Sequence, residues 1–355
     1  MNMFRTTTEE VRNQILNLVR EFVRRDVEPV ASRLENEDLY PQDIADKMKD
    51  MGLFGITIPE KYGGLGLDYT TYAMIFEELS KGWMSITGII GSHHMMSTII
   101  VSHGTEEQKR TFLPGMASGD IRGGLALTEP DAGSDVQSIQ TVAVPDNDGY
   151  AITGNKMFIT NAVKGNAYAV VAKTDTKAKP PYRGISCFIV QKPIDGLTVG
   201  RKLDKLGYRG VDTGGLIFDK CIVSRDNLIG GKEGNGFPQL MRGLEVGRVQ
   251  IAARAIGVAT AAFDASMRYV KQRKTFGKPI PDHQAIQLKL ADMATKIKAA
   301  RLLMLDASAK LDSGGRADLE AGMAKLFSSE VCQEVTLEAL RIHGGYGYIK
   351  EYPVE

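Results

Sequence analysis

Cysteine is scarce in this sequence. The 355 residues include three cysteines, Cys187, Cys221 and Cys332, which are odd in number and far apart. A disulfide framework needs an even set of closely spaced cysteines, so the sequence excludes a small, disulfide-stapled secreted fold. We therefore expect a reducing, intracellular compartment, specifically a cytoplasmic one.

The sequence has no marked excess of charge of either sign. Lys and Arg number 44 and Asp and Glu number 43, which gives a formal net charge of +1. Because there is neither a basic stripe nor an acidic tail, the sequence argues against a nucleic-acid partner and against a disordered chain. The composition, with 43% hydrophobic and 25% charged residues, is that of an ordinary globular protein.

Long uninterrupted apolar runs are also missing. The most apolar stretch, MSITGIIGSHHMMSTIIV at residues 84–101, is interrupted by Ser, Gly and two His residues. It therefore predicts a buried core helix and no membrane insertion. Residues 1–14, MNMFRTTTEEVRNQ, acquire acidic residues early and contain no long apolar stretch, so we expect neither a signal peptide nor a transit peptide.

Several common catalytic motifs are absent. The sequence contains no G-x-x-x-x-G-K-[ST], H-E-x-x-H, C-x-x-C or G-x-S-x-G. Its five histidines, at positions 93, 94, 103, 283 and 343, do not have the spacing of metal ligands. The sequence therefore predicts no metal site.

Three stretches of different character follow one another along the chain. Residues 8–119 carry helical patterns, including a TEEQ capping box at 105–108. From about residue 123 to 230, short β-branched runs alternate with turn residues, which is typical of antiparallel strands and not of βαβ units. Further on, apolar residues recur in steps of +4 and +3 and predict a helical bundle: Ile286, Leu290, Met293, Ile297, Ala300, Met304, Ala307 and Leu311.

The predicted fold class is mainly α with a central β domain. We expect an N-terminal helical domain over residues 1–122 and a middle antiparallel β-barrel over residues 123–232. Residues 233–355 should form a C-terminal helical bundle that is incomplete. A chain of this length has room for two or three domains with sizeable cores.

Polar residues gather where the predicted elements meet. LTEPDAGSD at 127–135 ends the first strand and offers hydroxyls and backbone N–H groups, as a pocket for a ring would; an ordinary turn is the alternative. FITNA at 158–162 likewise puts a hydroxyl at a strand end. Arg273 and Lys274 end a bundle helix, where they suit either a phosphate or merely the helix dipole.

Together these stretches resemble one family, the flavin-dependent acyl-CoA dehydrogenases. The resemblance runs along essentially the whole chain and rests on segments in a fixed order: YGGLGL (62–67), GTEEQKRTFLPGMASGD (104–120), LTEPDAGSD, GNKMFITNA (154–162), KLGYRG (205–210), RKTFGKPI (273–280), HQAIQLKLADM (283–293) and IHGGYGY (342–348). It implies α,β-dehydrogenation of an acyl-CoA thioester to the 2-enoyl-CoA. Hydride would pass to FAD, and electrons would pass on to an electron-transfer flavoprotein.

The resemblance also implies an FAD site built from several parts of the chain. Residues 125–134 would wrap the flavin ring, with Thr128 hydrogen-bonded to it and Thr160 near its N5 atom. Arg273 and Gln284 would bind the pyrophosphate of a neighbouring subunit's FAD, so we expect a homo-oligomer, a dimer of dimers. The implied cofactor-binding residues are Leu125, Leu127, Thr128, Gly133, Ser134, Phe158, Ile159, Thr160, Arg273, Phe276, Gln284, Arg341, Ile342, His343, Gly344 and Gly345.

The catalytic base is the part of the implied site that this sequence does not reveal. Most family members carry a glutamate in a turn that would lie beyond Glu355, and we expect the base there. A minority carry it at the position of Gly247, from which Glu245 is turned by about 200° on a helix. The implied substrate contacts are Ser134, which also reaches the CoA moiety, Glu245 at the substrate edge and Arg248, for which a surface ion pair is the alternative.

Two other functions stay open at this point. One is an acyl-CoA oxidase of the same superfold; the other is a non-catalytic scaffold that binds acyl-CoA or flavin. The joint presence of Thr128, Ser134, Thr160, Arg273 and Gln284 argues against the scaffold, because a scaffold has no reason to keep all five.

The acyl group is not identified by the sequence. Pocket depth should depend on the helix around IIGSHHMM at 89–96 and on the helix that bears Leu244. Because that first stretch contains no Arg to anchor a second carboxylate, the sequence does not support a dicarboxylyl-CoA substrate. His93 and His94 are expected to be core or subunit-contact residues.

Overall fold

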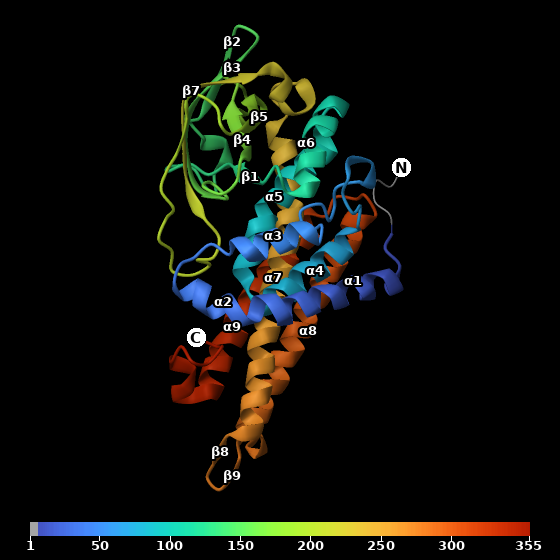
Figure 1. The fold of residues 1–355 in the computed structure, drawn as a ribbon, viewed down its shortest axis with the longest axis vertical. Coiled ribbons are helices and arrows are strands. Elements are labelled where there is room, and N and C mark those ends of the chain that lie inside the picture. Colours follow the sequence, from blue (N-terminus) through green and yellow to red (C-terminus); the bar gives the residue numbers. More distant parts are fainter. Residues whose placement is uncertain (1–5) are drawn as a thin grey trace.

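The N-terminal part of the protein is helical. The computed structural model describes residues 6–355, and its first helices form a layer across the middle of the molecule (Figure 1). A short π-helical turn, Val23–Val27, joins the first two of them. The helices are α1 (Glu9–Phe22), α2 (Glu28–Asn36), α3 (Gln42–Asp50), α4 (Tyr69–Gly82), α5 (Met84–His103) and α6 (Glu106–Ser118).

The helix starts follow from local capping chemistry. Thr8 and Asp68 accept hydrogen bonds from backbone N–H groups in the first turns of α1 and α4. The capping box predicted at residues 105–108 is confirmed: Thr105 and Gln108 bond reciprocally at the start of α6. Each cap satisfies backbone donors that the helix itself leaves without partners.

A curled sheet follows the helical layer and lies at the upper end of the molecule (Figure 1). Its spatial order is β1-β4-β2-β3-β7-β6, with β5 paired to β4. The strands are β1 (Gly123–Ala126), β2 (Val142–Asp146), β3 (Gly149–Thr160), β4 (Ala167–Lys173), β5 (Ile185–Gln191), β6 (Leu197–Val199) and β7 (Thr213–Ser224).

The sheet is mixed, whereas the sequence pattern predicted antiparallel pairing throughout. The pairs β2–β3, β3–β7, β4–β5 and β6–β7 are antiparallel, as predicted. The short strand β1 runs parallel to β4, and β2 meets β4 in parallel at Val142 and Lys173. The chain passes through the β2–β3 hairpin before it returns to β4, a long-range arrangement that period-two alternation cannot reveal.

Three long helices complete the fold. They are α7 (Gly236–Gln272), α8 (Gln284–Asp312) and α9 (Asp318–His343), and they run together down the long axis (Figure 1). A small hairpin, β8 (Lys274–Thr275) and β9 (Lys278–Pro279), links α7 to α8 at the lower tip. The predicted apolar seam is confirmed on α8, since every residue of it belongs to, or packs against, one hydrophobic core.

The core of the helical part is shared between the N-terminal layer and the bundle. Phe76 of α4, Ile256 of α7 and Met304 of α8 belong to one buried cluster. The order of helical layer, central sheet and helical bundle predicted from the sequence is therefore confirmed, and the layer and the bundle pack as one unit.

His93 and His94 on α5 are core residues. Each Nε2–H donates to a main-chain carbonyl, that of Phe54 for His93 and that of Leu53 for His94. Burial lowers the pKa of His93 to about 3 and that of His94 to about 4, so both rings are neutral near pH 7. Within residues 6–355, none of the helices has the length and apolar character that spanning a membrane requires.

Candidate functional site

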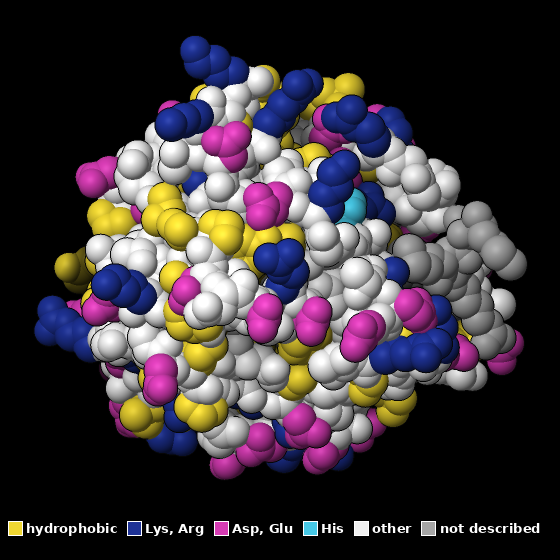
Figure 2. Space-filling view, turned by 90° about the horizontal axis from the view of Figure 1, so that it is seen from above, with side chains coloured by type: hydrophobic (Ala, Val, Ile, Leu, Met, Phe, Trp, Pro, Cys, Tyr) yellow, Lys and Arg dark blue, Asp and Glu magenta, His cyan; other side chains and the backbone are white. Residues whose placement is uncertain are grey.

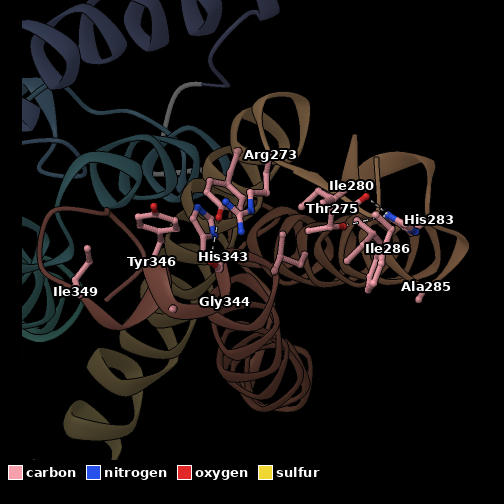
Figure 3. Close-up of a pocket in the computed structure, with 14 residues that line it drawn as sticks. Arg273, Thr275, Ile280, His283, Ala285, Ile286, His343, Gly344, Tyr346 and Ile349 are labelled. Carbon is pink, nitrogen blue, oxygen red and sulfur yellow. Dashed lines mark hydrogen bonds between the residues drawn. The ribbon is translucent and has the colours of Figure 1, made fainter. Parts of the chain in front are cut away.

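The lower end of the bundle carries an open groove with a volume of about 720 Å³, which we call the tip groove (Figure 3). It brings together six residues that were predicted to bind a cofactor: Arg273, Phe276, Ile342, His343, Gly344 and Gly345. Residues from the end of α7, the β8–β9 hairpin, the start of α8 and the end of α9 therefore share one surface.

Local chemistry explains the shape of the tip groove. The His343 ring stacks on Tyr269 with ring centroids 4.3 Å apart, and its Nδ1–H donates to the Ala339 carbonyl at 2.8 Å. Gly344 then turns the chain away from α9 with φ of +61°, a value that favours glycine. A Cβ atom at either Gly344 or Gly345 would meet open space, so the backbone there is accessible to a ligand.

The tip groove presents positive charge and apolar surface to the outside. Among the described residues, Arg273 forms no ion pair, and its guanidinium lies 5.9 Å from the centre of the Tyr346 ring. Phe276 is 96% exposed at the tip of the hairpin. A cation beside accessible backbone and an aromatic side chain suits an anion attached to a flat ring system.

Two predicted residues lie beside the tip groove and do not line it. Gln284 is the first residue of α8, next to the lining residues His283 and Ala285. The Arg341 side chain pairs with Glu338 on the same helix. The structure therefore does not bring Arg341 together with the other predicted residues.

A second group of predicted residues lies at the strand ends of the sheet. Leu125 and Leu127 are partly buried, whereas Gly133 and Ser134 are exposed. The carbonyl of Thr128 accepts a hydrogen bond from the Met157 N–H at 2.8 Å, which ties the loop to β3. Among the described residues, the hydroxyls of Thr128, Ser134 and Thr160 have no hydrogen-bond partner and can serve a ligand.

A buried ion pair fixes this loop. The Lys156 side chain is 1% exposed, and its Nζ donates to Glu129 Oε1 at 2.7 Å and to the Leu127 carbonyl at 3.0 Å. Burial lowers the pKa of Lys156 to about 8, although the Glu129 carboxylate acts in the opposite direction. For Glu129, burial alone would raise the pKa, but the Lys156 charge and the Gln140 N–H outweigh it and lower the pKa.

Strand β3 is irregular where it reaches the site. Its pairing with β7 shifts between Lys156 and Ile159, and Phe158 has φ of +60°, an uncommon value for a bulky residue. The bulge leaves Phe158 61% exposed while Ile159 points into the core. A strained, exposed aromatic residue beside a free hydroxyl is typical of a binding surface for a planar ligand.

The Thr160 side of this bulge faces a second pocket, partly open to solvent, with a volume of about 350 Å³, which we call the inner cavity. Its lining residues come from α5, β3, α7 and α9, together with the loop before β7. They include Gly88 and Ser92 of α5, Thr160 of β3, Tyr208 of the loop, Gly247 and Arg248 of α7, and Lys325 of α9. Within residues 6–355, the lining includes no Asp or Glu.

The three positions discussed for the substrate and the base differ in their placement. Gly247 and Arg248 line the inner cavity. Glu245 points elsewhere: its carboxylate accepts a hydrogen bond from Arg242 at 2.9 Å, and it is not part of the lining. The structure therefore does not place Glu245 at the cavity edge where a substrate contact was predicted, and the position of the base stays a prediction.

Two polar residues of the inner cavity, Arg254 and Gln250, were not predicted from the sequence. Both lie on α7 and contact the backbone of α5, more than 150 residues earlier in the chain. The local signal was a pair of glycines, Gly88 and Gly91, inside a largely buried helix. Glycine inside a helix is unfavourable and usually has a packing or functional reason.

Comparison with known proteins gives the same family along nearly the whole chain. Sequence models of the acyl-CoA dehydrogenase N-terminal domain, middle domain and C-terminal domain match residues 8–120, 124–221 and 234–355. An acyl-CoA dehydrogenase of Bacillus subtilis is 43% identical over 350 residues, which cover 98% of this chain and 91% of that protein.

Two solved structures are similar in both fold and sequence. Butyryl-CoA dehydrogenase from Megasphaera elsdenii has a TM-score of 0.94 and 36% identity, and the match covers 98% of this chain and 91% of that one. A chain in a structure described as "Electron transferring flavoprotein of Acidaminococcus fermentans" has a TM-score of 0.94 and 40% identity, with the same coverage of 98% and 91%. The chain thus belongs to the acyl-CoA dehydrogenase family, FAD-dependent oxidoreductases that carry out the α,β-dehydrogenation of acyl-CoA thioesters.

Proposed function

We propose that this protein dehydrogenates a short-chain acyl-CoA in the inner cavity, with FAD bound against the 127–135 loop and the end of β3. The observation that carries the proposal is the position of Thr160. Its side chain lines the inner cavity, and it lies two residues from the exposed Phe158 on the same strand. A flat ring on this strand end would therefore border the cavity that holds the acyl group.

The residues present fit an FAD molecule, provided that two copies of the chain share it. Hydroxyls without protein partners at Thr128 and Thr160 suit the polar edge of a flavin, and the tip groove suits a pyrophosphate through Arg273. In Figure 1 the sheet and the β8–β9 hairpin lie at opposite ends of the molecule. We therefore propose that the tip groove holds the adenosine diphosphate half of a neighbouring copy's FAD, with the glycines at 344 and 345 bringing backbone close to it.

The outer face of α9 supports this assembly. Leu319, Met323 and Leu326 are spaced by four and three residues, so they form one stripe, and each is exposed. An exposed apolar stripe of this kind is typical of an interface between subunits. We propose a homo-oligomer, a dimer of dimers, in which α8 and α9 take part.

The residues of the inner cavity have separate tasks in the reaction. When bound, FAD supplies the acceptor for the hydride that leaves the β-carbon of the substrate. Thr160 would orient the ring edge, and Arg248 would face the acyl thioester. The loop around Ser134, outside the cavity lining, would contact the CoA moiety. The α-proton must be taken by a carboxylate, and the expectation that this base lies beyond Glu355 stays a prediction.

The proposal also covers the protein that accepts the electrons. We propose that an electron-transfer flavoprotein reoxidises the enzyme, consistent with the similarity to a chain from a structure described by that name.

The three cysteines form no disulfide, and Cys187 and Cys221 are buried, which fits a protein that works in the cytoplasm. Figure 2 shows charges of both signs interspersed on one face of the molecule.

The test begins with the cofactor. Purified protein should be yellow, and denaturation should release FAD; release of FMN would contradict the proposal. Butanoyl-CoA added without oxygen to the protein lengthened beyond Glu355 should bleach the flavin absorbance and yield the 2-enoyl-CoA. In air, rapid oxygen consumption with peroxide formation would instead assign an acyl-CoA oxidase.

A further inference from the structure

The inner cavity contains a buried cation whose partners are all neutral. Arg254 of α7 lines the cavity and is 7% exposed. Its guanidinium donates to the Tyr208 hydroxyl at 2.7 Å, to the Thr87 carbonyl at 3.0 Å and to Gln250 Oε1 at 2.9 Å. Its Nε–H has no partner among the described residues, and no Asp or Glu of that part of the chain forms an ion pair with it.

The fold makes room for this arginine. A Cβ atom at Gly91 would lie 1.9 Å from Arg254 Nη2, and a Cβ atom at Gly88 would lie 1.9 Å from the Tyr208 hydroxyl oxygen. Two glycines of α5 therefore allow Arg254 and its partner Tyr208 to lie against the helix. Because glycine weakens a helix interior, the arrangement has a cost in stability that a purely structural cation would not justify.

One acid outside the cavity acts on this pair, but its hydrogen-bonding capacity is used by other groups. The charge of Glu35 acts on Tyr208, but its carboxylate accepts hydrogen bonds from Trp83, Ser85 and the backbone N–H groups of residues 209 and 210. The cavity also holds Arg248 and Lys325 in its lining. The positive charge of the inner cavity thus has no acidic counterpart in its lining within residues 6–355.

We propose that the acyl group of the substrate ends in a second carboxylate, which Arg254 binds at the inner end of the cavity. This inference rests on the proposed acyl-CoA dehydrogenation and narrows its substrate class to short dicarboxylyl-CoA thioesters. A buried cation is costly without a counter-charge, and a ligand carboxylate supplies both that charge and an acceptor for the free Nε–H. Arginine presents its N–H groups in the fork geometry that matches a carboxylate.

The placement of Arg254 on α7 fits a short substrate. It follows Gly247 by seven residues, which is two helical turns, so both residues face the same side and lie roughly 10 Å apart along the axis. Both residues line the inner cavity. A cavity of about 350 Å³ between the two positions suits an acyl chain of a few carbons.

The experiment compares two thioesters of equal carbon number, glutaryl-CoA and pentanoyl-CoA. Binding to the FAD-loaded chain is measured by isothermal titration calorimetry without oxygen, so the result does not depend on turnover. We expect the protein to bind glutaryl-CoA more tightly, and Arg254→Gln to lose about 100-fold of the glutaryl-CoA affinity, because one partner of a buried charge pair is then missing. The affinity for pentanoyl-CoA should stay within a few-fold.

Three further variants guard against a merely structural effect. Tyr208→Phe keeps the ring but removes the hydroxyl that orients Arg254, and we expect it to reduce the preference by about tenfold. Arg254→Lys should retain part of the preference, because the charge remains. Lys325→Gln, which removes an exposed cation of the same lining, should lower both affinities by one common factor.

The outcomes separate this inference from the proposed function. Equal affinities of the unchanged protein for the two thioesters, or equal losses of both in Arg254→Gln and in Tyr208→Phe, would overturn the dicarboxylyl assignment alone. If neither thioester binds to the FAD-loaded protein, the proposed function fails and this inference fails with it. Selective loss of glutaryl-CoA in both variants would support the assignment.

Discussion

The inner cavity and the tip groove differ in how far one copy of the chain completes them. In the cavity, Arg254, Gln250 and Tyr208 are fixed by hydrogen bonds to each other and to α5. In the groove, Arg273 has no ion-pair partner among the described residues, and Phe276 is almost fully exposed. The fixed side chains of the cavity can select one ligand over another. The exposed residues of the groove need a partner surface, which we expect a neighbouring copy of the chain to supply.

This difference separates substrate choice from cofactor retention. Changes in the cavity should alter which thioester binds and whether it reacts, with little effect on FAD. Changes in the groove should alter FAD retention and assembly, with little effect on the choice of thioester.

The largest expected effect concerns the position of the catalytic base. The described lining of the inner cavity includes no Asp or Glu, and Glu245 is engaged with Arg242. We therefore expect residues 1–355, loaded with FAD, to bleach with butanoyl-CoA about 100- to 10,000-fold more slowly than the chain lengthened past Glu355. Stopped-flow absorbance without oxygen measures both rates.

A control identifies the carboxylate if this expectation fails. Glu245→Gln in the lengthened chain should keep most of the rate. Equal bleaching rates of the short and lengthened chains would mean that a carboxylate within residues 1–355 acts as the base. A large loss of bleaching rate in Glu245→Gln would then identify Glu245 as that carboxylate.

The next largest effect tests the support under the flavin loop. Lys156→Met would leave the Glu129 carboxylate buried without its counter-charge, so we expect the free energy of unfolding to fall by about 3–5 kcal/mol. Urea denaturation followed by circular dichroism measures this change. Adding Glu129→Gln to Lys156→Met should recover much of the loss, because the remaining group is then neutral.

A matched substitution sets the background for that measurement. Lys177 is exposed in a loop of the same sheet region, and Lys177→Met should change the free energy of unfolding by less than about 0.5 kcal/mol. If Lys156→Met is no more destabilising than this control, the ion pair does not hold the loop.

Much of the fold was predictable because it depends on short-range patterns. The apolar steps from Ile286 to Leu311 define the buried side of α8, and the TEEQ segment fixes the start of α6. Both signals lie within a few turns of one helix. The placement of Arg273 beside the glycines at 344 and 345 was implied by the family resemblance, and the tip groove brings these residues together.

The parts that escaped prediction depend on contacts between distant segments. Arg254 bonds to Thr87, and Lys156 bonds to Glu129 across the loop, yet each residue alone resembles an ordinary surface charge in the sequence. The parallel pairing of β1 with β4 is also a tertiary choice. Residues 89–96 contain no arginine, and the buried arginine that lines the cavity beside them belongs to the facing helix, α7.

A pH effect of intermediate size tests the helix that forms the cavity wall. His93 and His94 on α5 have folded-state pKa values of about 3 and about 4, lowered from 6.5 first of all by burial. Between pH 6.5 and pH 4, these two histidines bind protons in the unfolded chain but remain largely unprotonated in the folded chain. The free energy of unfolding should therefore fall as the pH decreases from 6.5 toward 4, and it should not change from this cause above pH 7.

Replacing one ring isolates its share of this effect. His94→Gln keeps an N–H donor for the Leu53 carbonyl but cannot be protonated, so the fall between pH 6.5 and 4 should shrink by about 3 kcal/mol. Denaturation at several pH values provides the comparison. Parallel pH profiles for the variant and the unchanged protein would contradict the assignment of a neutral, buried His94.

The smallest expected effect tests the tip groove directly. Among the described residues, Arg273 has no ion-pair partner that Arg273→Ala would leave unpaired, so the fold should remain intact while FAD is held less tightly. Charge-assisted hydrogen bonds contribute about 1.5–3 kcal/mol, which corresponds to about a 10- to 100-fold higher dissociation constant for FAD.

Arg341→Ala is the matched control, because Arg341 lies beside the groove and pairs with Glu338. Fluorescence titration of the apoprotein with FAD should show a large change for the first variant and little for the second. Equal weakening by both would mean that the groove extends over Arg341. No weakening by Arg273→Ala would mean that the groove does not hold the pyrophosphate, and the contrast between the two sites would then need another explanation.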